Sequence, residues 1–240
     1  MKWLFIKIRR WIADMAGIKP SPMVSVLRFE GVIDTRRGVR GSLNLASVAG
    51  RIEDAFDLPG LSAVAVEINS PGGLPVQSEL ILERVRDLAR EKEVPVLAFC
   101  EDVAASGGYM LALAGDEIYA QKASIIGSIG VISAGFGFQK AIEKLGIDRR
   151  VYTAGDKKVT LDPFSDENPD DVKRLKKLQT EIHDHFIALV KKRRGKRLEG
   201  DDKKLFNGEV FTGQEAVDLG LIDEIGSLRP VLMKRFWQIR

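Results

Sequence analysis

Two apolar segments, each followed by a glycine turn, limit most strongly what this chain can fold into. Residues 63–68 form an almost wholly apolar run that leads into Asn69-Ser70-Pro71-Gly72-Gly73. Residues 95–100 form a second run, which leads into Asp102-Val103-Ala104-Ala105-Ser106-Gly107-Gly108-Tyr109. Apolar runs without polar alternation are typical of parallel strands that are covered on both faces. Because the carboxyl ends of parallel strands meet at one edge of a sheet, we expect both glycine turns to lie at that edge.

Strands and helices alternate along most of the chain, which predicts an α/β layered fold with right-handed crossovers. The expected strands are residues 24–30, 63–68, 95–100, 117–120, 130–133 and 148–153. The expected helices are residues 42–56, 75–90, 107–114, 136–145 and 169–194. A capped helix is expected to start at Thr212, and a short strand is expected between Gly220 and Gly226.

The length of 240 residues fits one large α/β domain with appended helices. With 45% hydrophobic and 30% charged residues, the chain has the composition of a globular protein that can build a core. We expect a basic amphipathic segment and linker over residues 1–22, one domain over residues 23–227, and a basic tail over residues 228–240. The domain includes the long helix of residues 169–194.

The first 19 residues predict a basic amphipathic helix. One face gathers the apolar side chains Leu4, Phe5, Ile8, Trp11, Ile12 and Met15. Arg9 and Arg10 interrupt the apolar core that a secretory signal would need, and no apolar run reaches the length of a transmembrane helix. A basic helix with tryptophans suits a membrane surface. Docking on the domain or on a neighbouring subunit is the alternative.

Charge and cysteine content exclude two classes of partner or site. The net charge of +3 is too small to indicate nucleic-acid binding, so we expect no nucleic-acid partner. Cys100 is the only cysteine, which excludes an internal disulfide and a cysteine-based metal cluster. Its place in an apolar strand predicts a plain buried thiol.

Ser106 is the strongest candidate for a nucleophile. It stands at the junction of an expected strand and an expected helix, where its hydroxyl would be held in the open. The backbone N–H of Gly107 could then bond an oxyanion formed on an attacked carbonyl, and Gly72 and Gly73 could bring a second N–H to the same place. Small residues also pack a helix closely on a sheet, and a Pro-Gly-Gly segment can be a simple turn. The motifs taken singly leave both interpretations open.

A serine nucleophile needs a base. His183 and His185 are the only histidines, and they stand two residues apart on the expected long helix, so they face different ways. The simplest interpretation makes them surface or interface residues. Lys157 and Lys158 follow the expected strand of residues 148–153. Most lysines are solvated surface charges, but a lysine that is shielded from water is a known alternative base.

Taken in order, three motifs resemble those of the signal peptide peptidase A family, which includes the SohB-like peptidases. They are Asn-Ser-Pro-Gly-Gly at 69–73, Ala-Ala-Ser-Gly-Gly-Tyr at 104–109 and Gly-Ser-Ile-Gly-Val at 127–131. The similarity runs from about residue 24 to residue 225, and the ordered set is specific although each motif alone is not. The resemblance implies a ClpP/crotonase-like fold of repeated strand-strand-helix units. It also implies a Ser-Lys dyad without metal or cofactor, in a ring-like homo-oligomer that cleaves hydrophobic peptides such as remnant signal peptides.

The resemblance also assigns five site residues. In the order nucleophile, base, two oxyanion donors and the serine that orients the base, they are Ser106, Lys158, Gly73, Gly107 and Ser128. Many family members carry Lys-Asp before a serine in the base region, whereas this chain has Asp156-Lys157-Lys158-Val159. Lys157 is therefore the alternative base. We expect the peptidase to associate peripherally with a membrane, taken to be the bacterial inner membrane.

Two functions of other kinds stay open at this point. An acyl-CoA hydratase or isomerase of the same fold class could use the paired glycine amides to polarise a thioester carbonyl, with Ser106 incidental. Such chemistry would need a glutamate or aspartate at the site. A membrane-attached scaffold could instead oligomerise through its termini and its long helix without any catalysis.

Overall fold

The computed structural model describes Met15, residues 21–35 and residues 42–237. The chain divides into two compact units. We call the larger one the sheet unit, and it consists of Met1–Ile129 and Leu189–Arg240. The second unit is Gly130–Ala188.

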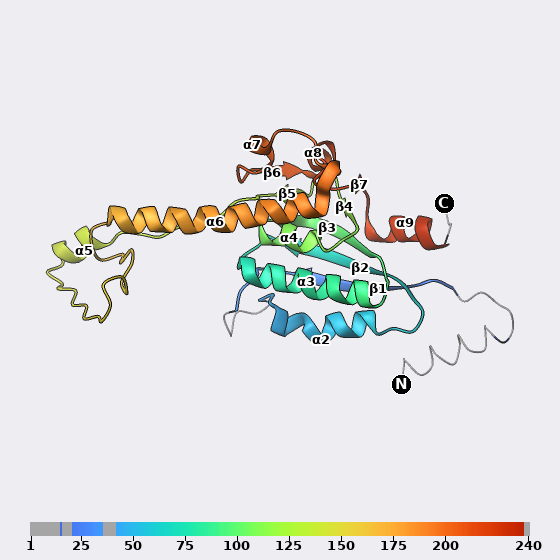
Figure 1. Cartoon of the computed structure of the whole chain (residues 1–240), viewed down its shortest axis with the longest axis horizontal. Coiled ribbons are helices and arrows are strands. Elements are labelled where there is room, and N and C mark those ends of the chain that lie inside the picture. Colours follow the sequence, from blue (N-terminus) through green and yellow to red (C-terminus); the bar gives the residue numbers. More distant parts are fainter. Residues whose placement is uncertain (1–14, 16–20, 36–41, 238–240) are drawn as a thin grey trace. The chain divides into compact units, whose positions relative to one another are not determined.

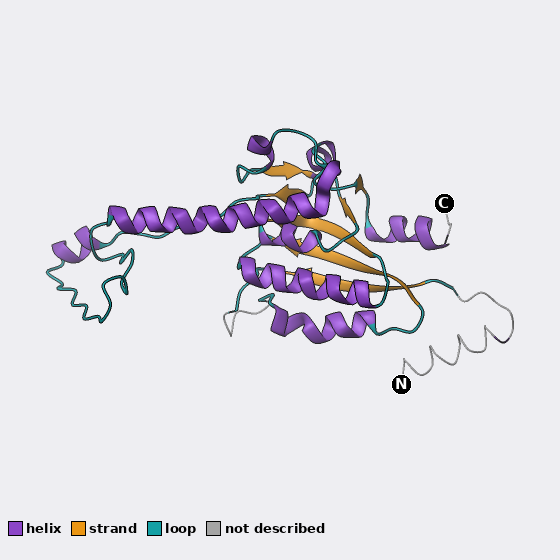
Figure 2. Ribbon diagram, viewed as in Figure 1, coloured by secondary structure: helices purple, strands orange, loops and turns teal. Residues whose placement is uncertain are grey.

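Seven strands form the sheet of the sheet unit, and five of them run parallel in the spatial order β1-β2-β3-β4-β7 (Figure 2). These five strands span Met23–Glu30, Leu61–Ser70, Val96–Ala105, Glu117–Ala120 and Glu224–Ile225. β5 (Ile125–Gly127) runs parallel to β3 and pairs antiparallel with β6 (Val210–Thr212). β2 and β3 lie in the middle and are buried on both faces over most of their length, so their sequences lack polar alternation.

Helices α2 (Leu45–Phe56), α3 (Pro75–Glu91) and α4 (Gly107–Ala112) cover one face of this sheet (Figure 1). α2 begins at a reciprocal cap, in which Asn44 and Ser47 each accept the other's backbone N–H on a side-chain oxygen. α3 begins with Pro75, whose fixed φ and missing N–H suit a first helical position. α3 and α4 each follow one of the glycine turns.

The segment after β7 packs against part of the opposite face of the sheet. It forms α9 (Leu228–Leu232) and the single π-helical turn η2 (Met233–Trp237). Leu232 joins a buried cluster with the strand residues Ala65, Leu97, Phe99 and Tyr119. The rings of Phe99 and Tyr119 stack with centroids 5.1 Å apart. Burial of one leucine side chain contributes about 1.5–3 kcal/mol, so this helix is part of the core of the sheet unit.

Two predicted strands in the second unit are wrong. Residues 130–133 and 148–153 are irregular, and neither segment pairs with a strand among the described residues. Their alternating apolar residues favour a strand, but a strand needs a neighbour for its backbone hydrogen bonds. The helix predicted over residues 136–145 is shorter, since α5 spans Gln139–Lys144.

The long helix α6 (Pro169–Arg194) has the bounds that the sequence predicts. Residues up to Ala188 belong to the second unit, and the last turn, from Leu189, belongs to the sheet unit. Beyond it come the short helices η1 (Gly195–Arg197), α7 (Asp202–Leu205) and α8 (Gly213–Asp218). The cap predicted at Thr212 is confirmed, because Thr212 Oγ1 accepts from the N–H of Glu215 at the start of α8.

Among the residues that the structure describes, none belongs to a helix that is both long enough and apolar enough to cross a membrane. The amphipathic helix predicted over residues 1–19 falls, apart from Met15, outside those residues. Its affinity for a membrane surface stays a prediction.

Candidate active site

Ser106 occupies a strained turn between β3 and α4. Its φ of 53° and ψ of −123° lie in a region that residues with a side chain rarely adopt. Two backbone hydrogen bonds hold it there: the Ser106 N–H donates to Gly127 O at 2.7 Å, and its carbonyl accepts from Met110 N–H at 3.0 Å. The hydroxyl makes no capping bond to the helix. In α/β-hydrolases the nucleophilic serine stands on a strained strand-to-helix turn of this kind, and Ser106 is partly exposed here.

The two glycine turns are in contact. A Cβ added to Gly72 would lie 2.7 Å from the N of Gly107 and 2.8 Å from the Cβ of Ser106. A Cβ on Gly107 would collide with the Ser78 hydroxyl, and a Cβ on Gly73 would collide with the Ile33 carbonyl. Gly72 and Gly73 also have φ values of 98° and 144°, which favour glycine. The close approach of these backbones therefore depends on residues without side chains, as the sequence predicts.

Two backbone amides in this contact are left without acceptors. Ile33 N–H donates to Gly72 O and Leu74 N–H donates to Ile33 O, both at 2.9 Å. Neither of these hydrogen bonds uses the N–H of Gly73, which lies between the two bonded residues in the sequence. Gly107 is the first residue of α4, where a helix offers no internal acceptor. Within the described residues neither of these two N–H groups has a hydrogen-bond acceptor. They are placed to bond an oxygen that forms beside Ser106.

Three polar side chains that the sequence argument did not assign support the turns. Ser70 Oγ donates to Gly31 O at 2.7 Å and accepts from Gly72 N–H at 3.2 Å. Asn69 Nδ2 donates to an Asp102 carboxylate oxygen at 2.9 Å and so ties the end of β2 to the end of β3. The Ser78 hydroxyl lies against Gly107 and donates to Leu74 O at 3.0 Å. Asn69 and Ser70 belong to the turn motif itself, whereas nothing in the sequence marks Ser78.

Ser128 lies beside the nucleophile turn. It follows Gly127, whose carbonyl accepts from Ser106 N–H, and its own N–H donates to Glu209 O at 2.7 Å. Its φ of 52° gives the end of β5 a sharp turn. The sheet unit thus brings together four of the predicted site residues: Ser106, Gly107, Gly73 and Ser128.

The predicted bases are in the other unit. Lys157 and Lys158 are exposed in a turn of the second unit, where Lys158 N–H donates to Gly155 O at 3.1 Å and Lys157 O accepts from Thr160 Oγ1 at 3.3 Å. His183 and His185 belong to the part of α6 that lies in the same unit. The structure therefore brings Ser106 together with the backbone N–H groups of Gly73 and Gly107, and the roles of these residues and of the base stay predictions.

Two buried titratable groups, one on β3 and one on α4, have raised pKa values. Cys100 is buried, which confirms the plain buried thiol predicted from the sequence, and this burial raises the pKa of the thiol to about 12. Burial also raises the pKa of Tyr109, whose hydroxyl donates to Leu221 O at 2.7 Å. No cluster of His, Cys, Asp and Glu that could hold a metal ion occurs in the described part of the chain.

A model of peptidase family S49 matches residues 88–235 of the chain. The chain is 30% identical over 232 residues to serine protease SPPA, chloroplastic, of Arabidopsis thaliana. The aligned region covers 92% of this chain and 33% of that protein. The chain is also 55% identical over 214 residues to a Brucella abortus protein named Na(+)/H(+) antiporter NhaA. Here the aligned region covers 89% of this chain and 29% of that protein. The chain thus spans about a third of the length of these relatives.

A solved structure has a similar fold. It is a mutant of the 1510-N membrane-bound stomatin-specific protease, with a TM-score of 0.56 at 16% sequence identity. The superposition covers 90% of this chain and 85% of that one. At this identity the similarity concerns the fold, and it confirms the layered ClpP-like α/β architecture predicted from the sequence.

Proposed function

We propose, from the premise that this chain belongs to peptidase family S49, that it cleaves hydrophobic peptides with a Ser106–Lys158 dyad. The chain is a serine peptidase by its family; the base and the substrate class are the proposal. The observation that carries it is the pair of unbonded N–H groups of Gly73 and Gly107 beside the strained Ser106. Together they form the oxyanion hole that acyl transfer needs.

In the proposed reaction, Ser106 Oγ attacks the carbonyl carbon of the scissile peptide bond while the lysine Nζ takes the hydroxyl proton. The carbonyl oxygen becomes an oxyanion that accepts from Gly73 and Gly107; loss of one such donor typically costs about 2.7–4 kcal/mol in the barrier. The lysine then passes the proton to the leaving amine as the C–N bond breaks. Water then attacks the resulting acyl-enzyme while the lysine takes a proton from it, and the lysine returns that proton to Ser106 Oγ as the ester bond breaks. Ser128 is proposed to orient the lysine amine.

The surface beside the turn of Gly72 and Gly73 supports a hydrophobic substrate. Val32, Leu74 and Val76 are 52%, 41% and 64% exposed. Val32 adjoins Ile33 and Leu74 adjoins Gly73 in the sequence, and Val76 lies two residues after Leu74. Large apolar side chains that are exposed next to a reactive group are typical of a site that takes apolar ligands. Remnant signal peptides and other membrane-derived segments have this chemistry, and we propose them as substrates.

Labelling with a serine-directed fluorophosphonate tests the proposed function. We expect a covalent adduct on Ser106 of the folded chain, found by mass spectrometry of its peptides, because the oxyanion hole stabilises the tetrahedral adduct. Heat-denatured protein is the control and should remain unlabelled. Absence of the adduct from the folded protein, together with hydration of an enoyl-CoA, would instead favour the acyl-CoA chemistry.

Exposed apolar side chains in the second unit support a homo-oligomer as the working form. Ile132, Phe136 and Tyr152 are 87%, 80% and 89% exposed, and large apolar side chains that are this open can pack against a second copy of the chain. We expect sedimentation velocity to give a species larger than the 26.6 kDa of one chain. Phe136→Ser should shift the distribution toward the single chain, whereas Val26→Ser, at an exposed valine of the sheet unit, should not. A wild-type chain that sediments only as a monomer would contradict the oligomer.

A further inference from the structure

The carboxyl end of α4, the helix that begins after Ser106, is capped by an arginine from another helix. α4 has six residues and all of them are buried. Arg193, in the last turn of α6, donates from Nε to Leu113 O at 2.7 Å and from Nη2 to Gly115 O at 2.9 Å. The two carbonyls, at the C-cap of α4 and two residues beyond it, would otherwise lack partners in a helix this short. One planar guanidinium thus holds the end of the helix at two points.

Neighbouring charges hold the Arg193 guanidinium in place. Arg86 donates to Ala114 O at 3.0 Å and pairs with Asp116 at 2.8 Å, while Arg193 lies 3.8 Å from the same carboxylate. Burial, assisted by the positive charge of Arg86, lowers the pKa of Arg193, and Asp116 opposes that effect. An arginine stays charged under these conditions, so the guanidinium remains a cation at neutral pH.

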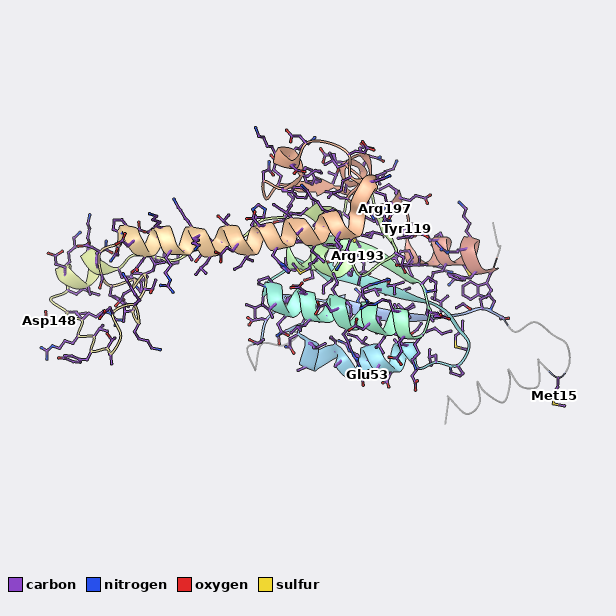
Figure 3. The ribbon with its side chains drawn as sticks, in the orientation of Figure 1. Met15, Glu53, Tyr119, Asp148, Arg193 and Arg197 are labelled. Atoms are coloured by element: carbon purple, nitrogen blue, oxygen red, sulfur yellow. The ribbon has the colours of Figure 1, made fainter. Side chains whose placement is uncertain are left out.

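The opposite end of α4 carries the reactive groups and has few bonds of its own. The Gly107 N–H has no acceptor in the described residues, and the Ser106 N–H makes the one backbone bond to β5. The position of the oxyanion donor therefore depends on where the whole helix is held, as well as on the packing of Gly107 against Gly72 and Ser78. Figure 3 labels Arg193 and Arg197 where α6 ends in the sheet unit. Arg193 also ties α4 to the helix that continues into the unit of Lys157 and Lys158.

We propose that Arg193 is a positioning residue of the proteolytic site: by capping Leu113 and Gly115 it fixes α4, and through α4 it fixes the Ser106 hydroxyl and the Gly107 N–H. The inference rests on the proposed function. It assigns to Arg193 a role in the rate of acylation, beyond its share in stability. A shift of about 1 Å in such a group can cost roughly 100-fold in rate.

The test compares Arg193→Met with Arg197→Met in the full chain. Arg197 belongs to the same polar cluster and donates to backbone carbonyls and to the Asp223 carboxylate, but to neither Leu113 nor Gly115. Its carbonyl partners are Asp116 O, Arg193 O and Arg194 O. We expect Arg193→Met to lower kcat and the rate of fluorophosphonate labelling by roughly 100-fold, with KM changed less than about twofold. Arg193→Lys keeps the positive charge but lacks the planar fork that reaches both carbonyls, so it should recover part of the rate. Methylguanidinium in the buffer should do the same for Arg193→Ala, whose truncated side chain leaves room for it.

A second readout does not depend on activity. Hydrogen exchange of the amides of Met110 and Leu111 in α4 should become faster in Arg193→Met and stay unchanged in Arg197→Met. The comparison is made under conditions that give the two variants the same free energy of unfolding in urea. Wild-type labelling rates and exchange rates in Arg193→Met would overturn the positioning role, as would an equal loss in Arg197→Met. If the wild-type chain itself were not labelled, the proposed function would fail, and the exchange data would still decide whether Arg193 fixes α4.

Discussion

Replacing Ser106 with alanine should abolish peptide hydrolysis while leaving the free energy of unfolding unchanged. The substitution removes the nucleophilic oxygen, and loss of the nucleophile in a serine peptidase costs on the order of 10⁶-fold in kcat. Alanine keeps the Cβ and therefore the same backbone strain at φ 53°. Hydrolysis of a fluorogenic apolar peptide and urea unfolding measure the two quantities.

Ser106→Gly is the informative companion variant. Glycine accepts the positive φ without strain, a relief of about 1–3 kcal/mol that exceeds its entropic cost of about 0.5–1 kcal/mol. We expect this variant to be more stable than the wild type and equally inactive. Ser133→Ala, at an exposed serine of the second unit, should keep full activity. Turnover by Ser106→Ala above about one hundredth of the wild-type rate would show that another group attacks the substrate.

Lys158→Met should lower kcat by about 10²–10⁴-fold, the usual contribution of a positioned general base. Methionine keeps an apolar stem of similar length and removes the amine, so the loss reports proton transfer. Lys157→Met is the matched control, one residue away in the same exposed turn, and should retain most of the activity. Steady-state kinetics on the same fluorogenic peptide give kcat for both variants.

The pair of lysine variants has other outcomes with definite meanings. Loss in Lys157→Met with retention in Lys158→Met would move the base to Lys157. Retention in both would remove the Ser-Lys dyad from the mechanism and return attention to His183 and His185, whose replacement by glutamine would be the next measurement.

The sequence was sufficient to predict the sheet edge at which the site forms. Apolar strands followed by glycine turns require parallel neighbours, and the contact between Gly72 and Gly107 is the result. The sequence could not predict that Ser78 packs on Gly107 or that Arg193 caps α4, because those contacts join elements that are distant in the chain. The strand predictions for residues 130–133 and 148–153 were wrong for another reason. An alternating pattern describes a single strand, whereas the neighbouring strand that it needs depends on the rest of the fold.

The cover of the second sheet face has a consequence for how the protein is made. Ala65, Leu97, Phe99 and Tyr119 are synthesised long before Leu232, which completes their cluster. On the ribosome, this apolar face stays open to other nascent chains until α9 has emerged, so the sheet unit is a natural client for chaperones that bind exposed apolar strands.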